Sequence, residues 1–404
     1  IMIDRNIKEL FPILNRTIYG KRLVYFDNGA TTQKPKQVID RIVQSYEQEN
    51  SNVHRGVHYL SELSTEAHEN ARKRVAEFIG AEQEEIIFTR GTTESINLVS
   101  RSYIEGFCKA GDEILFSAME HHSNMVPWQM AAERCDLTFK AIPVKDDGTL
   151  DIDAYKNLLS DKTRLVAITH TSNVLGTVNP IKEIAAIAHE AGANILVDAA
   201  QAIAHTKVNV KELGVDFLAF SGHKMYAPTG IGVLWGKREL LEAMPPFMGG
   251  GEMIDHVTLE HTTYGALPYK FEAGTPNYVG STALASAIDF MDSIGIENIH
   301  AHEEMLLKYA TEKLNQIDRV HIIGNAPEKS GIISFVVDGA HHYDIGLMLD
   351  KMGIAVRTGH HCAEPIMTRF GISGTVRISF AVYNTTEEID IFIEALKKIL
   401  NLLR

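Results

Sequence analysis

Short apolar runs alternate with amphipathic stretches between about residues 86 and 235. The runs are rich in β-branched and aromatic residues and too short for ordinary helices, so they predict strands. They are EIIFT (85–89), EILFSA (113–118), LVAITH (165–170), NILVDAA (194–200), FLAFS (217–221) and IGVLW (231–235). Strands that alternate with helices predict a mostly parallel sheet sandwiched by helices, with a ligand at the carboxyl ends of the strands.

The pattern changes after about residue 280, where the stretches with helical periodicity become longer. Helices are predicted over 280–295, 297–316, 341–353 and 386–403, and strands over 331–337, 354–362 and 376–382. We therefore predict an α/β fold made of a large domain (16–290) and a smaller α+β domain (291–404), on which residues 1–15 pack.

Composition limits the class of protein. The 404 residues are 45% hydrophobic and 23% charged, which is typical of a soluble globular protein. The formal charge of -13 argues against a nucleic-acid or anionic membrane surface. No apolar run is long enough to span a bilayer, and the start of the chain lacks the features of a signal peptide, so we expect a cytoplasmic protein.

Cysteine usage argues against a disulfide framework. The chain has three cysteines, an odd number in a long sequence without secretory features. Cys108 and Cys135 lie in helix-like patterns and are interpreted as buried structural thiols. Cys362 follows two histidines, in the segment RTGHHCAEP (357–365).

Lys224 follows an apolar strand directly, in the segment SGHKMYAPTGIG (221–232). Taken alone, a lysine usually lies at the surface. Burial at a strand end, however, would lower its pKa and make the amine a nucleophile. Twenty-six residues earlier, Asp198 ends another apolar strand, where a carboxylate needs a cationic partner or must cap the next helix. A protonated pyridine nitrogen would be such a partner, and Gln201 would contact the phenolic oxygen of the same ring.

An anion site is predicted in FTRGTTESIN (88–97), where a strand turns into a helix. Backbone N–H groups and the hydroxyls of Thr92 and Thr93 converge there with the helix dipole, although such residues also start ordinary helices. Ser221 and His223 supply further donors.

In SAMEHHSN (117–124), His121 follows another strand. It would stack on the ring and move protons, because imidazole titrates near neutrality. A structural histidine is the alternative.

Four motifs in this order resemble the cysteine desulfurases, class V enzymes of pyridoxal 5′-phosphate (PLP) fold-type I. They are THTSNVLGTVNP (169–180), VDAAQAIAH (197–205), SGHKMYAPTGIG (221–232) and RTGHHCAEP (357–365). The last motif, without a long insertion after the cysteine, resembles the group II branch of SufS and CsdA type, which overlaps with selenocysteine lyases. One departure is Gly29 in YFDNGATTQKP (25–35), where many members of the family carry alanine.

The resemblance implies a homodimer with active sites at the subunit interface and PLP bound covalently to Lys224. In the motif FEAGTP (271–276), it implies that Thr275 reaches the cofactor phosphate of the partner subunit. It further implies that Asn173 and Arg377 hold the substrate carboxylate, a role that a planar guanidinium suits. Arg357 is a further candidate in the same motif as Cys362.

The implied reaction converts L-cysteine to L-alanine and leaves the sulfur on Cys362 as a persulfide, with Lys224 and His121 moving protons. L-selenocysteine is an alternative substrate. Iron-sulfur cluster assembly and a SufE-like or SufU-like sulfur acceptor are implied as well. We expect His360, His361 and Arg357 to give the Cys362 thiolate an electropositive setting.

Three other interpretations are weaker. A metal site built on His121, His122, His360, His361 and Cys362 lacks the spacing of known metal motifs, so no metal is expected. A class V aminotransferase, a kynureninase-like hydrolase or an epimerase would need no cysteine in RTGHHCAEP. A sulfur or selenium carrier without catalytic activity would need no lysine at the end of a strand.

Overall fold

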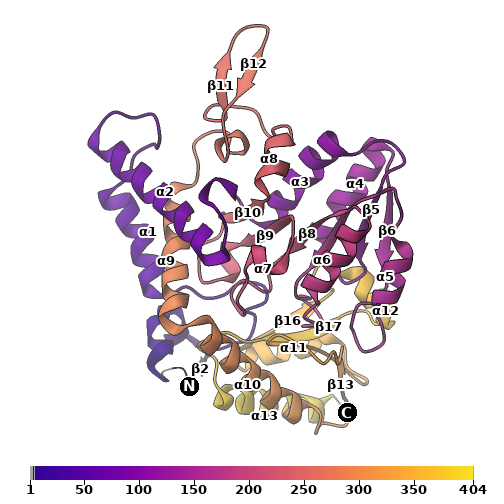
Figure 1. The fold of residues 1–404 in the computed structure, drawn as a ribbon. Helices are drawn as coiled ribbons and strands as arrows, with labels where there is room; N and C mark the ends of the chain where they lie inside the picture. Colours follow the sequence, from indigo (N-terminus) through magenta and orange to yellow (C-terminus); the bar gives the residue numbers. More distant parts are fainter. Residues whose placement is uncertain (1–2, 4, 404) are drawn as a thin grey trace.

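The computed structural model describes residues 3 and 5–403 and is built around a large central sheet (Figure 1). Its strand order is β4-β10-β9-β8-β7-β5-β6. The strands are β4 (Ile86–Thr89), β5 (Glu113–Ser117), β6 (Thr138–Ile142), β7 (Thr163–Thr169), β8 (Asn194–Asp198), β9 (Phe217–Ser221) and β10 (Gly232–Gly236). All six predicted strands are confirmed. The edge strand β6 was not predicted, because its side chains are mostly polar or exposed.

Pairing in this sheet is mostly parallel, as predicted. Strands β6, β5, β7, β8 and β9 run parallel to one another, whereas β10 is antiparallel to both of its neighbours. In this register, Asp198 at the end of β8 lies opposite Thr169 of β7 and Ala219 of β9. The carboxyl ends of the parallel strands therefore form one edge.

Both faces of the sheet are buried, which explains the continuous apolar runs. Successive residues of β7 and β8 alternate between two core clusters: Val166 and Val197 face one, and Ala167 and Leu196 face the other. Helices cover both faces. They are α1 (Lys36–Gln48), α2 (Tyr59–Ile79), α3 (Thr92–Phe107), α4 (Val126–Cys135), α5 (Ile152–Leu158), α6 (Ile181–Glu190), α7 (Val210–Leu213), α8 (Arg238–Ala243) and α9 (Tyr278–Ile294).

A hairpin projects from the body of the molecule beyond α8 (Figure 1). It consists of β11 (Ile254–Val257) and β12 (Thr262–Tyr264). Its tip carries Leu259, which is 100% exposed. Between the hairpin and α9 lies the segment 271–276, which contains Thr275.

A second sheet of order β13-β14-β17-β16 carries the C-terminal part of the chain. It packs with the helices of that region around a separate core cluster. These elements are α10 (Ile296–Leu314), β13 (Val320–Ile323), β14 (Ile332–Val337), α11 (His342–Lys351), β15 (Ile354–Ala355), β16 (Arg357–Gly359), α12 (Glu364–Phe370), β17 (Thr375–Ser379) and α13 (Thr386–Leu402). The short helix α12 was not predicted.

The N-terminal segment lies between the two parts of the chain. Lys8 forms an ion pair with Glu388 of α13, and Phe11 packs against the rings of Tyr226, Phe290 and Tyr383. Short strands follow: β1 (Thr17–Ile18), β2 (Lys21–Arg22) and β3 (Val24–Tyr25), of which β3 pairs in parallel with β15. Residues 1, 2 and 4 of the predicted 1–15 segment, and residue 404 of the predicted small domain, lie outside the described residues.

Within residues 3 and 5–403, no helix combines the length and the apolar character that crossing a bilayer requires.

Candidate active site

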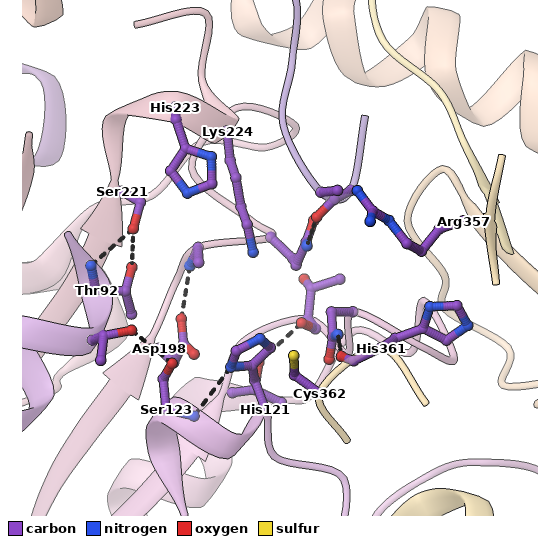
Figure 2. A pocket seen from close by; sticks show the side chains of 18 of the residues that line it. Thr92, His121, Ser123, Asp198, Ser221, His223, Lys224, Arg357, His361 and Cys362 are labelled. Carbon is purple, nitrogen blue, oxygen red and sulfur yellow. Dashed lines mark hydrogen bonds between the residues drawn. The ribbon is translucent and has the colours of Figure 1, made fainter. Parts of the chain in front are cut away.

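A cavity of about 290 Å³ opens at the carboxyl ends of the parallel strands. It brings together residues from segments far apart in the sequence (Figure 2). Of the predicted site residues, it contains Thr92, Thr93, His121, Asn173, Asp198, Gln201, Ser221, His223, Lys224, Arg357, Cys362 and Arg377. Thr275 does not line it; this side chain is exposed elsewhere on the same chain.

Lys224 ends a short 3-10 helix, η5 (Gly222–Lys224), that follows β9. Figure 2 shows its side chain pointing into the cavity, toward the side that carries His121 and Cys362. Burial lowers the pKa of Lys224 to about 8, so the uncharged amine is far more abundant near neutral pH than in an ordinary lysine, although the cation still predominates. The preceding carbonyl, of His223, accepts hydrogen bonds from Thr31 Oγ1 at 2.9 Å and from Lys34 Nζ at 2.8 Å. These contacts fix the peptide that carries the lysine.

Asp198 lies buried at the end of β8. One carboxylate oxygen accepts a hydrogen bond from the backbone N–H of Ala200 at 2.9 Å. Burial raises the pKa of Asp198, because a carboxylate away from water needs a nearby cation to stay ionised. The adjacent Gln201 donates from Nε2 to the carbonyl of Gly29 at 2.7 Å, which holds its side chain in the cavity wall.

The predicted anion site lies where α3 begins. The backbone N–H of Thr92 donates to Ser221 Oγ at 2.8 Å, and the Thr92 hydroxyl is 2.7 Å from the same oxygen. Thr93 Oγ1 lies 2.7 Å from Ser123 Oγ. Strand β10 passes so close to this turn that a Cβ on Gly232 would lie 2.4 Å from the Cα of Gly91. The helix N-terminus and these hydroxyls therefore all line the same cavity.

These features fit PLP. Its phosphate matches the hydroxyls and helix start at Thr92 and Thr93, and its ring nitrogen would supply the cation that Asp198 requires. Its aldehyde matches the buried amine of Lys224.

His121 enters the cavity from the turn after β5. Its Nδ1 accepts a hydrogen bond from the backbone N–H of Ser123 at 3.1 Å, so the ring proton lies on Nε2. Burial, followed by the charge of Lys224, lowers the pKa of His121 to about 3. The expectation that this imidazole titrates near neutrality is therefore wrong, because burial keeps it neutral.

The turn that carries His121 is anchored by Glu120, which sequence reasoning missed. Glu120 is fully buried and accepts hydrogen bonds from Thr169 N at 2.9 Å and from Asn124 Nδ2 at 2.7 Å. Burial raises its pKa to about 8. The apolar-strand signal could not identify it, because one of its partners, Thr169, lies on a strand 49 residues away.

Arg377 lies on β17, almost fully buried at the cavity wall. Burial lowers its pKa to about 10, so the guanidinium remains charged at neutral pH. Its Nη1 donates to the carbonyl of Asn173 at 2.9 Å, and Asp27 lies 3.6 Å from Nη2. Among the buried side-chain atoms described, Arg377 Nε is one that lacks a hydrogen-bond partner. A carboxylate in the cavity would supply one.

Arg357 lies farther out, on β16. Its Nη2 and Nε bond the two oxygens of Asp27 at 2.7 and 3.2 Å. Asp27 therefore lies between Arg357 and Arg377 and orients both guanidinium groups.

Cys362 is exposed at the mouth of the cavity, on a strained turn. His361 and Cys362 have φ values of 55° and 54°, a left-handed conformation that costs energy in residues other than glycine. The turn is held by Asn173 Nδ2, which donates to the His361 carbonyl at 2.7 Å. The N–H of His122 donates to the Cys362 carbonyl, also at 2.7 Å.

The electropositive setting of Cys362 differs from the prediction. Burial and the charge of Arg377 lower the pKa of His361 to about 2, so its imidazole is neutral and cannot stabilise a thiolate by charge. Its Nε2 instead lies 2.7 Å from Thr375 Oγ1 and supports the turn. Positive charge comes from Lys224 and Arg377, both of which interact electrostatically with Cys362.

Comparisons with known proteins show the family to which this chain is similar. Residues 24–392 match the family model for "Aminotransferase class-V". A probable cysteine desulfurase from Vibrio cholerae is 49% identical over 398 residues, which cover 98% of each chain.

Solved structures give the same result. The apo structure of a cysteine desulfurase from Thermococcus onnurineus superimposes with a TM-score of 0.94 at 41% identity, covering 99% of both chains. The cysteine desulfurase CsdA (S-sulfonic acid) from Escherichia coli gives a TM-score of 0.91 at 37% identity, covering 98% of both. These matches confirm the predicted fold-type I architecture.

Proposed function

This chain belongs to the aminotransferase class-V family, and on that premise we propose that it is a group II cysteine desulfurase that converts L-cysteine to L-alanine. The observation that supports this most directly is the position of Cys362 at the mouth of the cavity that contains Lys224. An aminotransferase, a kynureninase-like hydrolase or an epimerase would need no thiol there. The named relatives, which are cysteine desulfurases, agree.

PLP is the cofactor; when bound, it supplies an electron sink for the bonds at the substrate Cα. Thr92, Thr93, Ser221 and His223 would hold its phosphate, Asp198 and Gln201 its ring, and Lys224 its reactive carbon. Arg377 binds the substrate carboxylate through its unpaired Nε, and Asn173 and Arg357 complete that side of the cavity.

Proton movements fall to two side chains. The Lys224 amine, whose pKa burial lowers to about 8, takes the proton from the substrate Cα in its uncharged form and becomes cationic by doing so. The Nε2–H of the neutral His121 donates a hydrogen bond on the opposite wall and so orients the group that receives the proton. The two groups thus take complementary roles, one as base and one as donor.

Sulfur transfer then uses Cys362. Its thiolate attacks the substrate sulfur, and a new S–S bond forms while the C–S bond breaks. The electron pair of the broken bond stays with the carbon fragment, which gains protons and leaves as alanine. The product on the protein is a Cys362 persulfide, stabilised as an anion by the charges of Lys224 and Arg377.

A SufE-like or SufU-like protein would receive this sulfur. Helix α12 begins at Glu364, two residues after Cys362, and the turn is held by hydrogen bonds on both sides of the cysteine. The persulfide therefore cannot move far, and an acceptor must come to it. From the family resemblance, we place the protein in the cytoplasm, in iron-sulfur cluster assembly.

A homodimer is part of the proposal. Thr275 lies exposed outside its own cavity, as expected for a residue that contacts the cofactor of a partner subunit. Large apolar side chains are also exposed, including Val57 at 96% and Leu259 at 100%. Two-fold dimers are the commonest symmetric assembly.

The test compares Cys362→Ser with the parent on L-cysteine and L-selenocysteine. Alanine formation from cysteine should fall by at least about 100-fold, because sulfur must be taken by a nucleophile. The loss on selenocysteine should be much smaller, since the C–Se bond is weaker and the selenol more acidic. Cys135→Ser, outside the cavity, is the matched control.

The visible absorbance of bound cofactor must be retained in both variants, so that damage to the pocket can be recognised. Undiminished desulfuration of cysteine by Cys362→Ser would refute the persulfide assignment. Equal losses on the two substrates, with the absorbance retained, would mean that selenium release also requires Cys362.

A further inference from the structure

Arg72 of α2 is fully buried, far from solvent and outside the active-site cavity. A buried guanidinium is costly unless each of its donors is paired with an acceptor. Here Nη1 and Nη2 bond the two carboxylate oxygens of Glu272 at 2.5 and 2.9 Å, and Nη1 also donates to the Ile86 carbonyl at 2.9 Å. This two-point geometry fixes the orientation of Glu272 as well as its distance.

Glu272 is tied to the sheet as well as to the helix. Its Oε1 accepts a hydrogen bond from the backbone N–H of Phe88, in β4, at 2.7 Å. The chain then leaves the core: Gly274 N donates to the Gly251 carbonyl at 2.9 Å, and Thr275 is exposed. Glu272 is thus the last buried anchor before Thr275, three residues upstream of it.

The same arginine organises a wider network. Its Nε bonds Glu69 Oε2 at 3.0 Å, and Glu69 Oε1 lies 2.9 Å from His54 Nε2. The neighbouring Arg55 bonds Glu252, beside Gly251, at 2.9 Å. Loop 54–55, segment 251–252 and segment 272–276 are therefore joined around Arg72.

This cluster could be mistaken for a metal site. Ligand atoms of His54, His68 and Glu69 lie within 4.8 Å of one another. However, Arg72 Nη2 is 3.3 Å from His68 Nε2, and Arg72 also bonds Glu69. The guanidinium already supplies the positive charge at this point, which favours an ionic anchor over a cation site.

We propose that Arg72, through its ion pair with Glu272, is a positioning residue for the active site of the partner subunit, because it fixes the segment that presents Thr275 there. This inference rests on the proposed homodimer. It predicts that loss of the anchor weakens cofactor binding in the other subunit and leaves the site of its own subunit intact.

Mixed dimers that carry different affinity tags test this directly. In the first, one subunit carries Lys224→Ala and the other Glu272→Gln, so the surviving lysine site receives Thr275 from the subunit with the intact anchor. In the second, Lys224→Ala and Glu272→Gln are on one subunit and the partner is wild type. The surviving site then receives Thr275 from the altered subunit.

The readout is a PLP titration of each apo dimer, followed by the visible absorbance of cofactor held covalently at Lys224. The first dimer should bind PLP as tightly as a wild-type/Lys224→Ala dimer. The second should bind roughly tenfold more weakly, the loss expected for a misplaced hydrogen bond to a charged group. The same pair of dimers is also made with Arg72→Met in place of Glu272→Gln. If Arg72→Met fails to fold, the Glu272→Gln dimers still test the inference.

Three results would overturn the inference: weakening in the first dimer alone, equal weakening in both, or none in either. The first would mean an effect on the same subunit, and the second a general structural effect. The same pair of dimers made with Thr275→Ala is the control. If Thr275→Ala gives no effect across the interface, the proposed contribution of Thr275 to the partner's site fails and this inference with it; if mixed dimers do not form at all, the proposed homodimer fails. If Thr275→Ala does give an effect across the interface, the result for Glu272→Gln judges Arg72 alone.

Discussion

Gly29→Ala should weaken substrate binding through Arg377. A Cβ at position 29 would lie 3.2 Å from both Cζ and Nη2 of Arg377 and 3.3 Å from Ser379 Oγ. These contacts are tighter than ordinary packing allows, so the guanidinium has to move by a few tenths of an ångström. Arg377 is buried and cannot swing into solvent. Its displacement would disturb the geometry on which two-point carboxylate binding depends.

The size of the effect follows from the cost of moving this side chain. A side chain forced about 30° from its preferred rotamer costs about 0.5–1.5 kcal/mol. Since about 1.4 kcal/mol corresponds to a tenfold change in affinity, KM for L-cysteine should rise about two- to tenfold. Because Lys224 and Cys362 lie on other segments, kcat should change little.

The assay is steady-state alanine formation over a range of L-cysteine concentrations, in the presence of a thiol reductant. The same substitution in an Arg377→Lys background is the matched control, because lysine lacks the atoms that Cβ would crowd. The Gly29→Ala effect should disappear there. An unchanged KM in the parent background, or an equal increase in both backgrounds, would show that Arg377 does not transmit the effect.

Two further predictions concern the cofactor lysine and sulfur release. Covalent uptake of PLP by the apoenzyme should accelerate as pH rises and level off above about 8, because burial lowers the pKa of Lys224 to about 8 and only the free amine reacts. Lys224→Ala should abolish both that uptake and turnover. The assignment would be contradicted if the rate of uptake in the parent protein had its inflection near the ordinary lysine pKa, or if the Lys224→Ala variant turned over at the parental rate. A SufE-like or SufU-like protein should raise turnover, since persulfide clearance limits the rate; full activity with reductant alone, with no gain from any such protein, would argue against this.

Local sequence patterns predict the strands of the large sheet and the polar side chains that follow them. The six apolar runs are strands because burial on both faces demands continuous apolar residues. Polar residues that directly follow such runs, among them Lys224 and His121, meet at one edge because parallel strands end there. The edge strand β6 escaped prediction because an exposed strand needs no apolar run.

The sequence by itself therefore determined the parallel sheet and the collection of polar side chains at its carboxyl edge. Only the tertiary structure decided their charge states and supports. His361 is neutral because of burial and the nearby Arg377, and neither can be read from its neighbours in the chain. Arg72 and Glu272 are 200 residues apart and meet only in the folded core. Ionisation and ion pairing depend on solvent exclusion and distance in space, which local periodicity does not encode.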